Sequence, residues 1–309
     1  MPTRWPKVRG RAVWESNVPL ASLTRYRIGG PAARFWQVET RHDLSVALES
    51  LEGAGYRVLG WGANVLVSDR GVPEPVISLS GDFDYLRMLG EAVEAGGAAG
   101  LPALVGDARR EGRFGWDFLE AVPGSVGGGL RMNAGSVEIG IWDRVLWAEV
   151  MTPAGDCVRI SPDEAAPSYR AVAVPDEWVF TGALFAAPPG DPNAVNAVHA
   201  ECRRQKVEGQ VYELPTCGSI WKNPGPPYGS AWELVDRAGM RGAVSGGAQI
   251  TERHANFIAN LGDATAADVL WLMAETRRRV NDRDGICLEP EICLWGFEVD
   301  ELAAVGGAP

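Results

Sequence analysis

The chain has 309 residues, of which 46% are hydrophobic and 22% are charged, so it is long enough for two domains of a soluble globular protein. Its net charge of −11 argues against broad nucleic-acid binding, and no apolar run reaches the roughly 18 to 20 residues of a membrane span. The five cysteines lack C-x-x-C spacing and the three histidines are far apart, so we expect free thiols and no structural metal. The basic N-terminal stretch lacks the apolar segment of a signal peptide, which predicts a cytoplasmic protein.

The first half of the chain predicts short strands and helices separated by glycine-rich turns. Residues 43–53 have apolar side chains at helical spacing, and two apolar β-like runs follow at 56–59 and 64–67. A further helix is predicted at 101–113, where Leu101, Leu104, Val105 and Ala108 share one face. Further strands are predicted at 75–81, 91–96, 145–151, 157–160 and 178–186.

Residues 188–193 combine proline, glycine and aspartate without apolar periodicity, which makes them the best candidate for a domain boundary. We therefore divide the chain into residues 1–190, with two subdomains split near 70–90, and residues 191–309, whose last residues could return to the first subdomain. Helices are predicted in the second part at 194–209, 231–239 and 265–281, the last one opening with a capping box from Thr265 to Asp268.

Two glycine-rich segments follow apolar runs, GWGAN at 60–64 and PGSVGGG at 123–129. Neither matches G-x-G-x-x-G before a helix, nor the Walker pattern. Backbone N–H groups in such loops can bind phosphate without obstruction by side chains. A third glycine-rich site, the glycine pair after Arg27 and Ile28, adds to the evidence for phosphate binding. Together the three segments favour a pyrophosphate-containing cofactor.

A short run at 285–296, GICLEPEICLWG, is predicted to be a strand. Alternation places Glu289, Glu291 and Cys293 on one face, with Leu288, Ile292 and Leu294 on the other. A glutamate on such a face can be a general acid or can polarise a developing charge. The alternative is an edge strand with a solvated polar face, which the pattern alone favours.

The stretch TCGSIWKNPG at 216–225 places Ser219 before a predicted Lys-Asn-Pro-Gly turn. Taken alone, this pattern favours a strand, a turn and an incidental serine. By the same standard Arg170 is a surface arginine and His254 a structural histidine.

The order of these segments along the chain is far more specific than any one of them. It resembles the UDP-N-acetylenolpyruvoylglucosamine reductase (MurB) family over nearly the whole sequence. The matching stretches are TRYRIGGPA (24–32), VLGWGANVLVSD (58–69), FLEAVPGSVGGGLRMNAG (118–135), SYR (168–170), CGSIWKNP (217–224), AGMRG (238–242), GGAQITERHANFIAN (246–260) and GICLEPEI (285–292).

The resemblance implies an α+β fold, with an N-terminal FAD-binding region of the PCMH or vanillyl-alcohol-oxidase type and a C-terminal α+β substrate domain. It also implies NADPH as the reductant and reduction of the enolpyruvyl ether of a UDP-sugar to UDP-N-acetylmuramate, a step of peptidoglycan precursor synthesis. No membrane, nucleic acid or obligate protein partner is implied.

Matched residue by residue, the resemblance makes Ser219 the proton donor, with Arg170 and Glu291 stabilising the charge that develops on the substrate. The residues implied in FAD binding are Arg27, Ile28, Gly29, Gly60, Gly62, Ala63, Asn64, Val65, Leu66, Pro123, Gly124, Ser125, Gly127, Gly128, Met132, Asn133, Ala134 and Gly135. Those implied in substrate binding, including its diphosphate or the NADPH phosphate, are Arg204, Lys206, Lys222, Asn223, His254 and Asn256.

The sequence departs from the family pattern at a few positions. Ala63 replaces a serine of the first flavin loop, and Ala171-Val172 stand where a serine is common. No tyrosine corresponds to the mobile tyrosine loop of type I members, so the chain resembles type II. Two alternatives remain open at this point: another PCMH-type flavin oxidoreductase, for which His42 lies outside the loop used for covalent tethering, and a non-catalytic flavin-binding paralogue.

Overall fold

A computed structural model describes residues 13–307, which form two compact units. Within the described residues, unit 1 takes those up to 16 together with 34–61 and 74–206, and unit 2 takes 17–33, 62–73 and the chain from 207 onward. Most of the basic N-terminal stretch weighed as a signal peptide lies outside the described residues. The domain boundary at 188–193 stays a prediction; the division between the units falls after Lys206.

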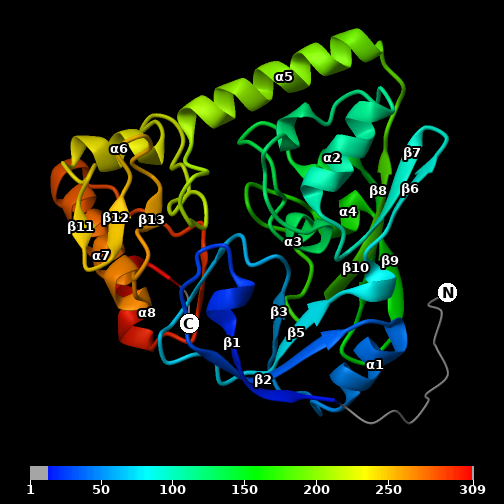
Figure 1. Ribbon diagram of the computed structural model, residues 1–309, viewed down its shortest axis with the longest axis horizontal. Helices are drawn as coiled ribbons and strands as arrows, with labels where there is room; N and C mark the ends of the chain where they lie inside the picture. Colours follow the sequence, from blue (N-terminus) through cyan, green and yellow to red (C-terminus); the bar gives the residue numbers. More distant parts are fainter. Residues whose placement is uncertain (1–12, 308–309) are drawn as a thin grey trace. The chain divides into compact units, whose positions relative to one another are not determined.

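Figure 1 labels the elements along the chain. The helices are α1 (Arg41–Glu49), α2 (Leu101–Arg110), α3 (Val126–Arg131), α4 (Pro162–Ala165), α5 (Pro192–Gly209), α6 (Ala231–Arg237), α7 (Ala266–Asp284) and α8 (Val299–Val305), with 3-10 turns η1 (Leu20–Leu23), η2 (Gly81–Phe83), η3 (Asp117–Leu119) and η4 (Ile141–Arg144). The strands are β1 (Glu15–Pro19), β2 (Pro31–Val38), β3 (Arg57–Leu59), β4 (Val65–Val67), β5 (Val76–Leu79), β6 (Leu86–Leu89), β7 (Ala92–Gly96), β8 (Val145–Met151), β9 (Cys157–Ile160), β10 (Val179–Ala186), β11 (Val244–Ser245), β12 (Ala248–Ile250), β13 (Ile258–Asn260) and β14 (Cys293–Trp295).

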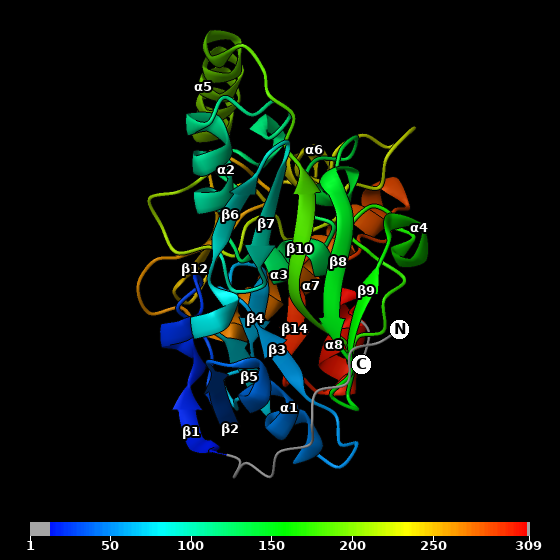
Figure 2. The same cartoon turned by 90° about the vertical axis from the view of Figure 1, so that its right-hand side faces the viewer.

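Unit 1 contains a five-stranded antiparallel sheet in the order β6-β7-β10-β8-β9. Figure 2 shows these strands side by side. The central strand β10 pairs with β7 and β8 along most of its length. The predicted helix α2 buries the expected face, because Leu101, Leu104, Val105 and Ala108 are all within the core. Within this core the rings of Trp116 and Phe185 pack edge to face, with their centroids 5.6 Å apart.

The other sheet of unit 1 is built around parallel strands. β5 pairs with both β2 and β3, in the sheet order β1-β2-β5-β3. Helix α1 begins at a capping box in which Thr40 and Asp43 exchange hydrogen bonds, and it buries Leu44, Ala47 and Leu48. The predicted succession of helix and strands in this region is confirmed.

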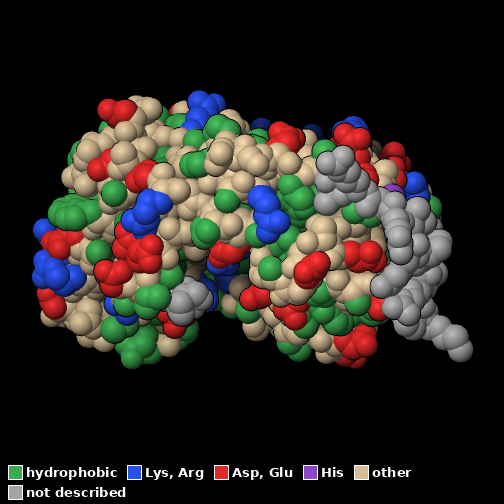
Figure 3. Space-filling model, turned by 90° about the horizontal axis from the view of Figure 1, so that it is seen from below, with side chains coloured by type: hydrophobic (Ala, Val, Ile, Leu, Met, Phe, Trp, Pro, Cys, Tyr) green, Lys and Arg blue, Asp and Glu red, His purple; other side chains and the backbone are tan. Residues whose placement is uncertain are grey.

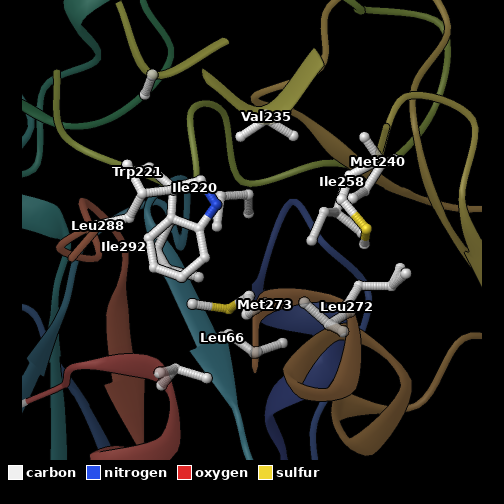
Figure 4. Packing of buried hydrophobic residues seen from close by; sticks show 14 of the residues in the cluster. Leu66, Ile220, Trp221, Val235, Met240, Ile258, Leu272, Met273, Leu288 and Ile292 are labelled. Atoms are coloured by element: carbon white, nitrogen blue, oxygen red, sulfur yellow. The ribbon is translucent and has the colours of Figure 1, made fainter. Parts of the chain in front are cut away.

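Unit 2 combines an antiparallel sheet, β11-β12-β13, with a parallel pair, β14-β4. The pair joins the last strand of the chain to a strand from residues 65–67, so the sheet unites distant parts of the sequence. Helix α7 begins at the predicted capping box of Thr265 and Asp268. Figure 4 shows its apolar side chains Leu272 and Met273 pointing toward Leu66 and Ile258 in one core.

All five cysteines are free thiols, as predicted. On the face shown in Figure 3, acidic and basic side chains are interspersed. The chain as a whole is acidic, with a net charge of −11. Among residues 13–307, none of the helices combines the length and the apolar character that crossing a membrane requires.

Two local predictions are wrong. The run 285–296 contains only a three-residue strand, β14, because Pro290 lacks an N–H donor and the preceding residues make isolated contacts instead of a ladder. Leu288 and Ile292 are nevertheless buried, as the alternation predicted.

The second wrong prediction is the turn expected at Lys222–Gly225. Residues 222–224 form no turn, and the Lys222 N–H instead donates to the Glu289 carbonyl oxygen at 2.9 Å. The reversal lies further along, where Gly225 and Gly229 both have positive φ and the Tyr228 N–H donates to the Gly225 carbonyl oxygen at 2.8 Å.

Candidate active site

The glycine-rich segment at 121–135 forms a turn, the short helix α3 and a return loop within unit 1. The Ser125 hydroxyl caps α3 by accepting from the Gly128 N–H at 3.3 Å. Gly127 must be small, because a Cβ there would lie 3.1 Å from the Gly97 carbonyl oxygen. The N–H groups of Gly124 and Ser125 donate to no other residue between 13 and 307, although both residues are buried.

Gly60 and Trp61, the part of the glycine-rich segment 60–64 that belongs to unit 1, lie against residues 121–135. A Cβ on Gly60 would be 2.5 Å from the Ser125 hydroxyl oxygen, so the two loops touch here and a larger residue would displace the Ser125 side chain. The Trp61 ring covers Gly100, whose own Cβ would be 2.3 Å from it. Unpaired N–H donors, a hydroxyl and glycines in close approach form a donor set that suits phosphate oxygens.

Arg170 lies in a tight turn of unit 1, close to the end of the same segment. Ser168 and Ala171 form the bridge that closes the turn, and Arg170 has a φ of 57°, which is unusual for a residue other than glycine. Its guanidinium donates to the Gly135 carbonyl oxygen at 3.0 Å, and the Asn133 side chain donates to the Ser168 carbonyl oxygen at 3.0 Å. The structure therefore brings Arg170 together with the predicted flavin residues at 133–135.

Ser219 lies in unit 2, in an extended segment that runs between two others. On one side it bridges Phe257, and the Ile220 N–H donates to the Asn256 carbonyl oxygen at 2.9 Å. On the other side the Glu291 N–H donates to the Ile220 carbonyl oxygen at 2.8 Å. The hydroxyl of Ser219 is half-buried and has no hydrogen-bond partner within the described part of the chain, so it is available to a bound molecule.

Glu291 is held by the first flavin loop as well as by the Ser219 segment. The Asn64 side chain donates to the Glu291 carbonyl oxygen at 3.0 Å, and the Cys293 N–H donates to the Asn64 carbonyl oxygen at 3.0 Å. Backbone hydrogen bonds thus connect Asn64, Glu291 and the residue after Ser219 in unit 2. The structure brings two of the three predicted catalytic residues, Ser219 and Glu291, into one hydrogen-bonded frame.

The two side chains that follow Ser219 point into the core of unit 2. Figure 4 shows Ile220 and Trp221 beside Leu288 and Ile292, the buried residues on either side of Glu289 and Glu291. Packing therefore fixes both segments from beneath. Ser219 and Glu291 are only partly buried, at the margin of this core.

The remaining predicted flavin residues of unit 2 occupy constrained backbone positions. Gly29 has a φ of 125°, and a Cβ on it would be 2.5 Å from Val67. Gly62 also has positive φ, and a Cβ there would be 2.5 Å from the Leu23 carbonyl oxygen. Arg27 is exposed with a φ of 55°, while Ile28 is buried. Glycine is therefore required at Gly29 and Gly62 for a local steric reason.

Two buried groups lie behind the Ser219 segment. Burial raises the pKa of the Cys217 thiol well above its usual value, and nearby Cys293 and Glu291 add to the shift. Burial also raises the pKa of Tyr26, with a smaller contribution from Cys217. Both groups are therefore neutral near pH 7, which keeps this side of Ser219 apolar.

His254 and Asn256 adjoin the Ser219 segment but have different surroundings. The His254 ring packs edge-on to Phe257 at 4.8 Å between centroids, and burial followed by the charge of Arg241 lowers its pKa. Asn256 is buried, and its amide bonds the backbone of Trp221 in both directions. This arrangement favours a positioning role for Asn256 over direct contact with the substrate.

Two substrate-binding candidates of unit 2 already have partners in the structure. Lys222 lies 3.6 Å from a carboxylate oxygen of Glu289, a pair that is open to solvent. The Asn223 side chain accepts from the Ala231 N–H at 2.9 Å at the start of α6.

In unit 1 the candidates on α5 are also engaged. Arg204 pairs with Glu201 on the exposed side of the helix. Lys206 donates to two carbonyl oxygens, those of Phe118 and Glu120, at 2.8 Å each. Glu120 and its buried partner His199 are absent from the predicted site residues. The position of Glu120, three residues before the Pro123-Gly124 pair of the glycine-rich segment, was a sequence signal that could have identified it.

Two family models match the chain. One, described as the C-terminal domain of UDP-N-acetylenolpyruvoylglucosamine reductase, matches residues 210–295, and the other, described as an FAD binding domain, matches residues 32–161.

Among curated proteins, the chain is similar to the UDP-N-acetylenolpyruvoylglucosamine reductases of Paramagnetospirillum magneticum and Rhodospirillum rubrum. The first is 40% identical over 296 residues, 96% of this chain and 95% of that protein. The second is 38% identical over 305 residues, 97% of this chain and 95% of that protein. Among solved structures, the chain is similar to UDP-N-acetylenolpyruvylglucosamine reductase (MurB) from Thermus caldophilus, with 36% identity and a TM-score of 0.80 over 92% of this chain and 99% of that one.

Proposed function

Because this chain belongs to the UDP-N-acetylenolpyruvoylglucosamine reductase family, we propose that it reduces UDP-N-acetylglucosamine enolpyruvate to UDP-N-acetylmuramate for peptidoglycan synthesis, with FAD as cofactor and NADPH as reductant. The observation that carries the proposal is the frame of unit 2: the Glu291 N–H donates to the carbonyl oxygen of Ile220, the residue after Ser219, and the Asn64 side chain donates to the Glu291 carbonyl oxygen. A proton donor and a carboxylate held next to a flavin loop are what this chemistry requires.

The residues present fit FAD. In unit 1, the N–H groups of Gly124 and Ser125 and the close approach of Gly60 leave donors for a diphosphate without side-chain obstruction. In unit 2, Gly29, Gly62 and Ala63 contribute backbone donors of the same kind. Ala63 offers no hydroxyl, so at that position a phosphate contact would have to come from the backbone. A bound FAD would supply the hydride chemistry of the reduction, between NADPH and the enolpyruvyl group of the substrate.

Ser219 supplies the proton that completes the reduction. Hydride addition leaves an enolate-like carbanion next to the substrate carboxylate, and a hydroxyl with no partner in the described chain can donate to it. The segment cannot move away easily, because Ile220 and Trp221 are anchored in the core.

Arg170 and Glu291 act on the charge of the substrate. A guanidinium binds a carboxylate in a fixed, bidentate geometry and stabilises negative charge that develops during reduction. The backbone of Glu291 is fixed by hydrogen bonds with Ile220 and Asn64, so its side chain starts from a fixed backbone position. The roles of both residues rest on the family match at SYR and LEPEI.

The test is to purify the protein, record its flavin absorption and follow NADPH oxidation with and without the enolpyruvyl UDP-sugar. We expect a bound flavin and NADPH oxidation that depends on that substrate. A yellow protein that oxidises NADPH equally well without the UDP-sugar would indicate another flavin oxidoreductase. A yellow protein inactive under both conditions would indicate a non-catalytic flavin-binding protein.

A further inference from the structure

Helix α5 faces the segment before the second flavin loop with a row of polar side chains. Of its eighteen residues, only Val195 and His199 are buried, so no apolar stripe holds the helix in place. Its contacts instead come from His199, Arg203 and Lys206, which are spaced by four and three residues and therefore share one face. All three reach residues 118–120.

The contacts converge on Glu120, at both its side-chain carboxylate and its backbone carbonyl oxygen. Glu120 is only 5% exposed, and its carboxylate lies 2.9 Å from Nδ1 of His199, which is 1% exposed, and 3.8 Å from the Arg203 guanidinium. Lys206 donates to the carbonyl oxygens of both Phe118 and Glu120 at 2.8 Å. A buried carboxylate is costly without partners, so such clusters serve to fix a conformation more than to add stability.

The residue that follows Glu120 has a strained backbone. Ala121 has a φ of 57°, in the left-handed region that is unfavourable for an ordinary residue and that glycine adopts freely. Such conformations persist where the surroundings impose them, often beside ligands. Ala121 lies two residues before Pro123 and three before Gly124, where the flavin loop begins. The α5 contacts are thus placed to impose this conformation.

We propose that Glu120, His199 and Lys206 are positioning residues for FAD: they hold Ala121 in the left-handed conformation and so present the N–H groups of Gly124 and Ser125 to the diphosphate. Lys206 then acts through the protein backbone, with its ammonium group taken up by two carbonyl oxygens, and needs no contact with the substrate. This inference rests on the proposed function, because it assumes that FAD binds at the 123–129 loop.

The primary variant is Lys206→Met, which keeps the aliphatic stem and removes the ammonium group. We expect FAD to bind about 10- to 100-fold more weakly, the range for hydrogen bonds to a charged group, and to leave the holoenzyme faster on dilution, followed by the return of free flavin fluorescence. The matched control is Gln205→Met, an exposed neighbour on α5 that bonds only Glu201. This control should release FAD at the wild-type rate.

The decisive variant adds Ala121→Gly to Lys206→Met. If the α5 contacts act by imposing the left-handed conformation, glycine should recover about fivefold of the lost affinity, because it adopts that conformation without the penalty. A purely structural role of Lys206 would give no such rescue. Ala121→Gly alone should bind FAD at least as tightly as the wild type, which gives a second test if Lys206→Met fails to fold.

Two results would overturn the inference while leaving the proposed function intact: a wild-type enzyme that binds FAD and a Lys206→Met enzyme that binds it equally well, or weaker FAD binding by Ala121→Gly alone. Weak binding by Lys206→Met without rescue would also overturn it. If the wild-type protein itself binds no FAD, the proposed function fails, and this inference fails with it.

Discussion

Asn256 bonds the backbone of Trp221 with both ends of its side-chain amide. Its Oδ1 accepts from the Trp221 N–H at 2.9 Å, and its Nδ2 donates to the Trp221 carbonyl oxygen at 2.8 Å. Both residues are buried, so water is not at hand to replace either bond. Together with the bond from the Ile220 N–H to the Asn256 carbonyl oxygen, this pairing fixes the chain two residues after Ser219.

The first prediction follows from this pairing. Asn256→Ala leaves a buried N–H and a buried C=O unsatisfied, so we expect the free energy of unfolding to fall by about 2–4 kcal/mol and the proton-transfer step to slow as Ser219 loses its support. Thermal unfolding and single-turnover kinetics measure the two effects. Asn256→Asp, which places a buried carboxylate oxygen against the Trp221 carbonyl oxygen, should destabilise the protein at least as much. An unchanged unfolding temperature with a raised KM for the UDP-sugar would instead favour the original prediction of substrate contact.

The second prediction concerns the half-reactions. Ser219→Ala should leave reduction of the flavin by NADPH nearly unchanged, because no proton donor to the substrate is needed there. Reoxidation by the enolpyruvyl UDP-sugar should slow by about 10²- to 10⁴-fold, the usual contribution of a general acid. Stopped-flow absorbance of the flavin separates the two steps. Ser219→Cys, which retains a proton-donating group, should lose less, and equal loss in both half-reactions would contradict the proton-donor role.

The third prediction compares two neighbouring glutamates. Glu291→Gln should slow reoxidation by about 10²- to 10³-fold, the range for loss of one electrostatic contact to the transition state. Glu289→Gln is the matched control, since the Glu289 side chain is 73% exposed and pairs only loosely with Lys222. We expect the control to stay within about twofold of the wild type. Similar losses in both variants would mean that the segment tolerates neither change, and would remove the evidence for a special role of Glu291.

Much of the fold was predictable because its signals are local. The helical stripe of α7, the cap at Thr265 and the buried face of α2 each depend on residues within a few positions of one another. The site was predictable only through the order of its motifs. The bond from Asn64 to Glu291 joins residues 227 positions apart, and no local pattern encodes it.

The two wrong predictions have different origins. Pro290 interrupts the apparently alternating run at 285–296, and this is a local effect of a residue without an N–H donor. The turn lies at Gly225–Gly229 instead of Lys222–Gly225, and here the bond from Lys222 to Glu289 joins distant segments and overrides the local preference. The contacts of His199 and Lys206 with Glu120 are also nonlocal, so the sequence predicted the helix at 194–209 but not its contacts with Glu120.

The fourth prediction concerns cysteine reactivity. Burial raises the pKa of the Cys217 thiol, so at pH 8 it should resist alkylation in the folded protein, because the thiolate is the reactive form. Exposed Cys287 is the internal control and should react quickly. Iodoacetamide labelling followed by peptide mass spectrometry measures both, and denaturant should make Cys217 as reactive as Cys287. Rapid labelling of Cys217 in the folded state would mean that the Ser219 segment opens readily.

The last prediction is a pH dependence of stability. Burial, and then the charge of Arg241, lowers the pKa of His254, whose ring also contacts Trp232 and Phe257. The unfolded chain therefore takes up the proton first, at a pKa of about 6.5, while the folded state resists it. Stability contributed by neutral His254 is present above that pH and is lost as the pH falls below it, with a slope of at most about 1.4 kcal/mol per pH unit.

His254→Gln removes the titrating group and keeps a polar side chain. Unfolding temperatures of the wild type and the variant, measured between pH 8 and pH 5, should differ in slope only below about pH 6.5, where the wild type should lose stability more steeply. Arg241 remains paired with Asp236 in both proteins, so its own charge does not change over this range. Parallel curves, or a wild type that gains stability relative to the variant toward acid, would show that His254 is not held neutral in the folded state.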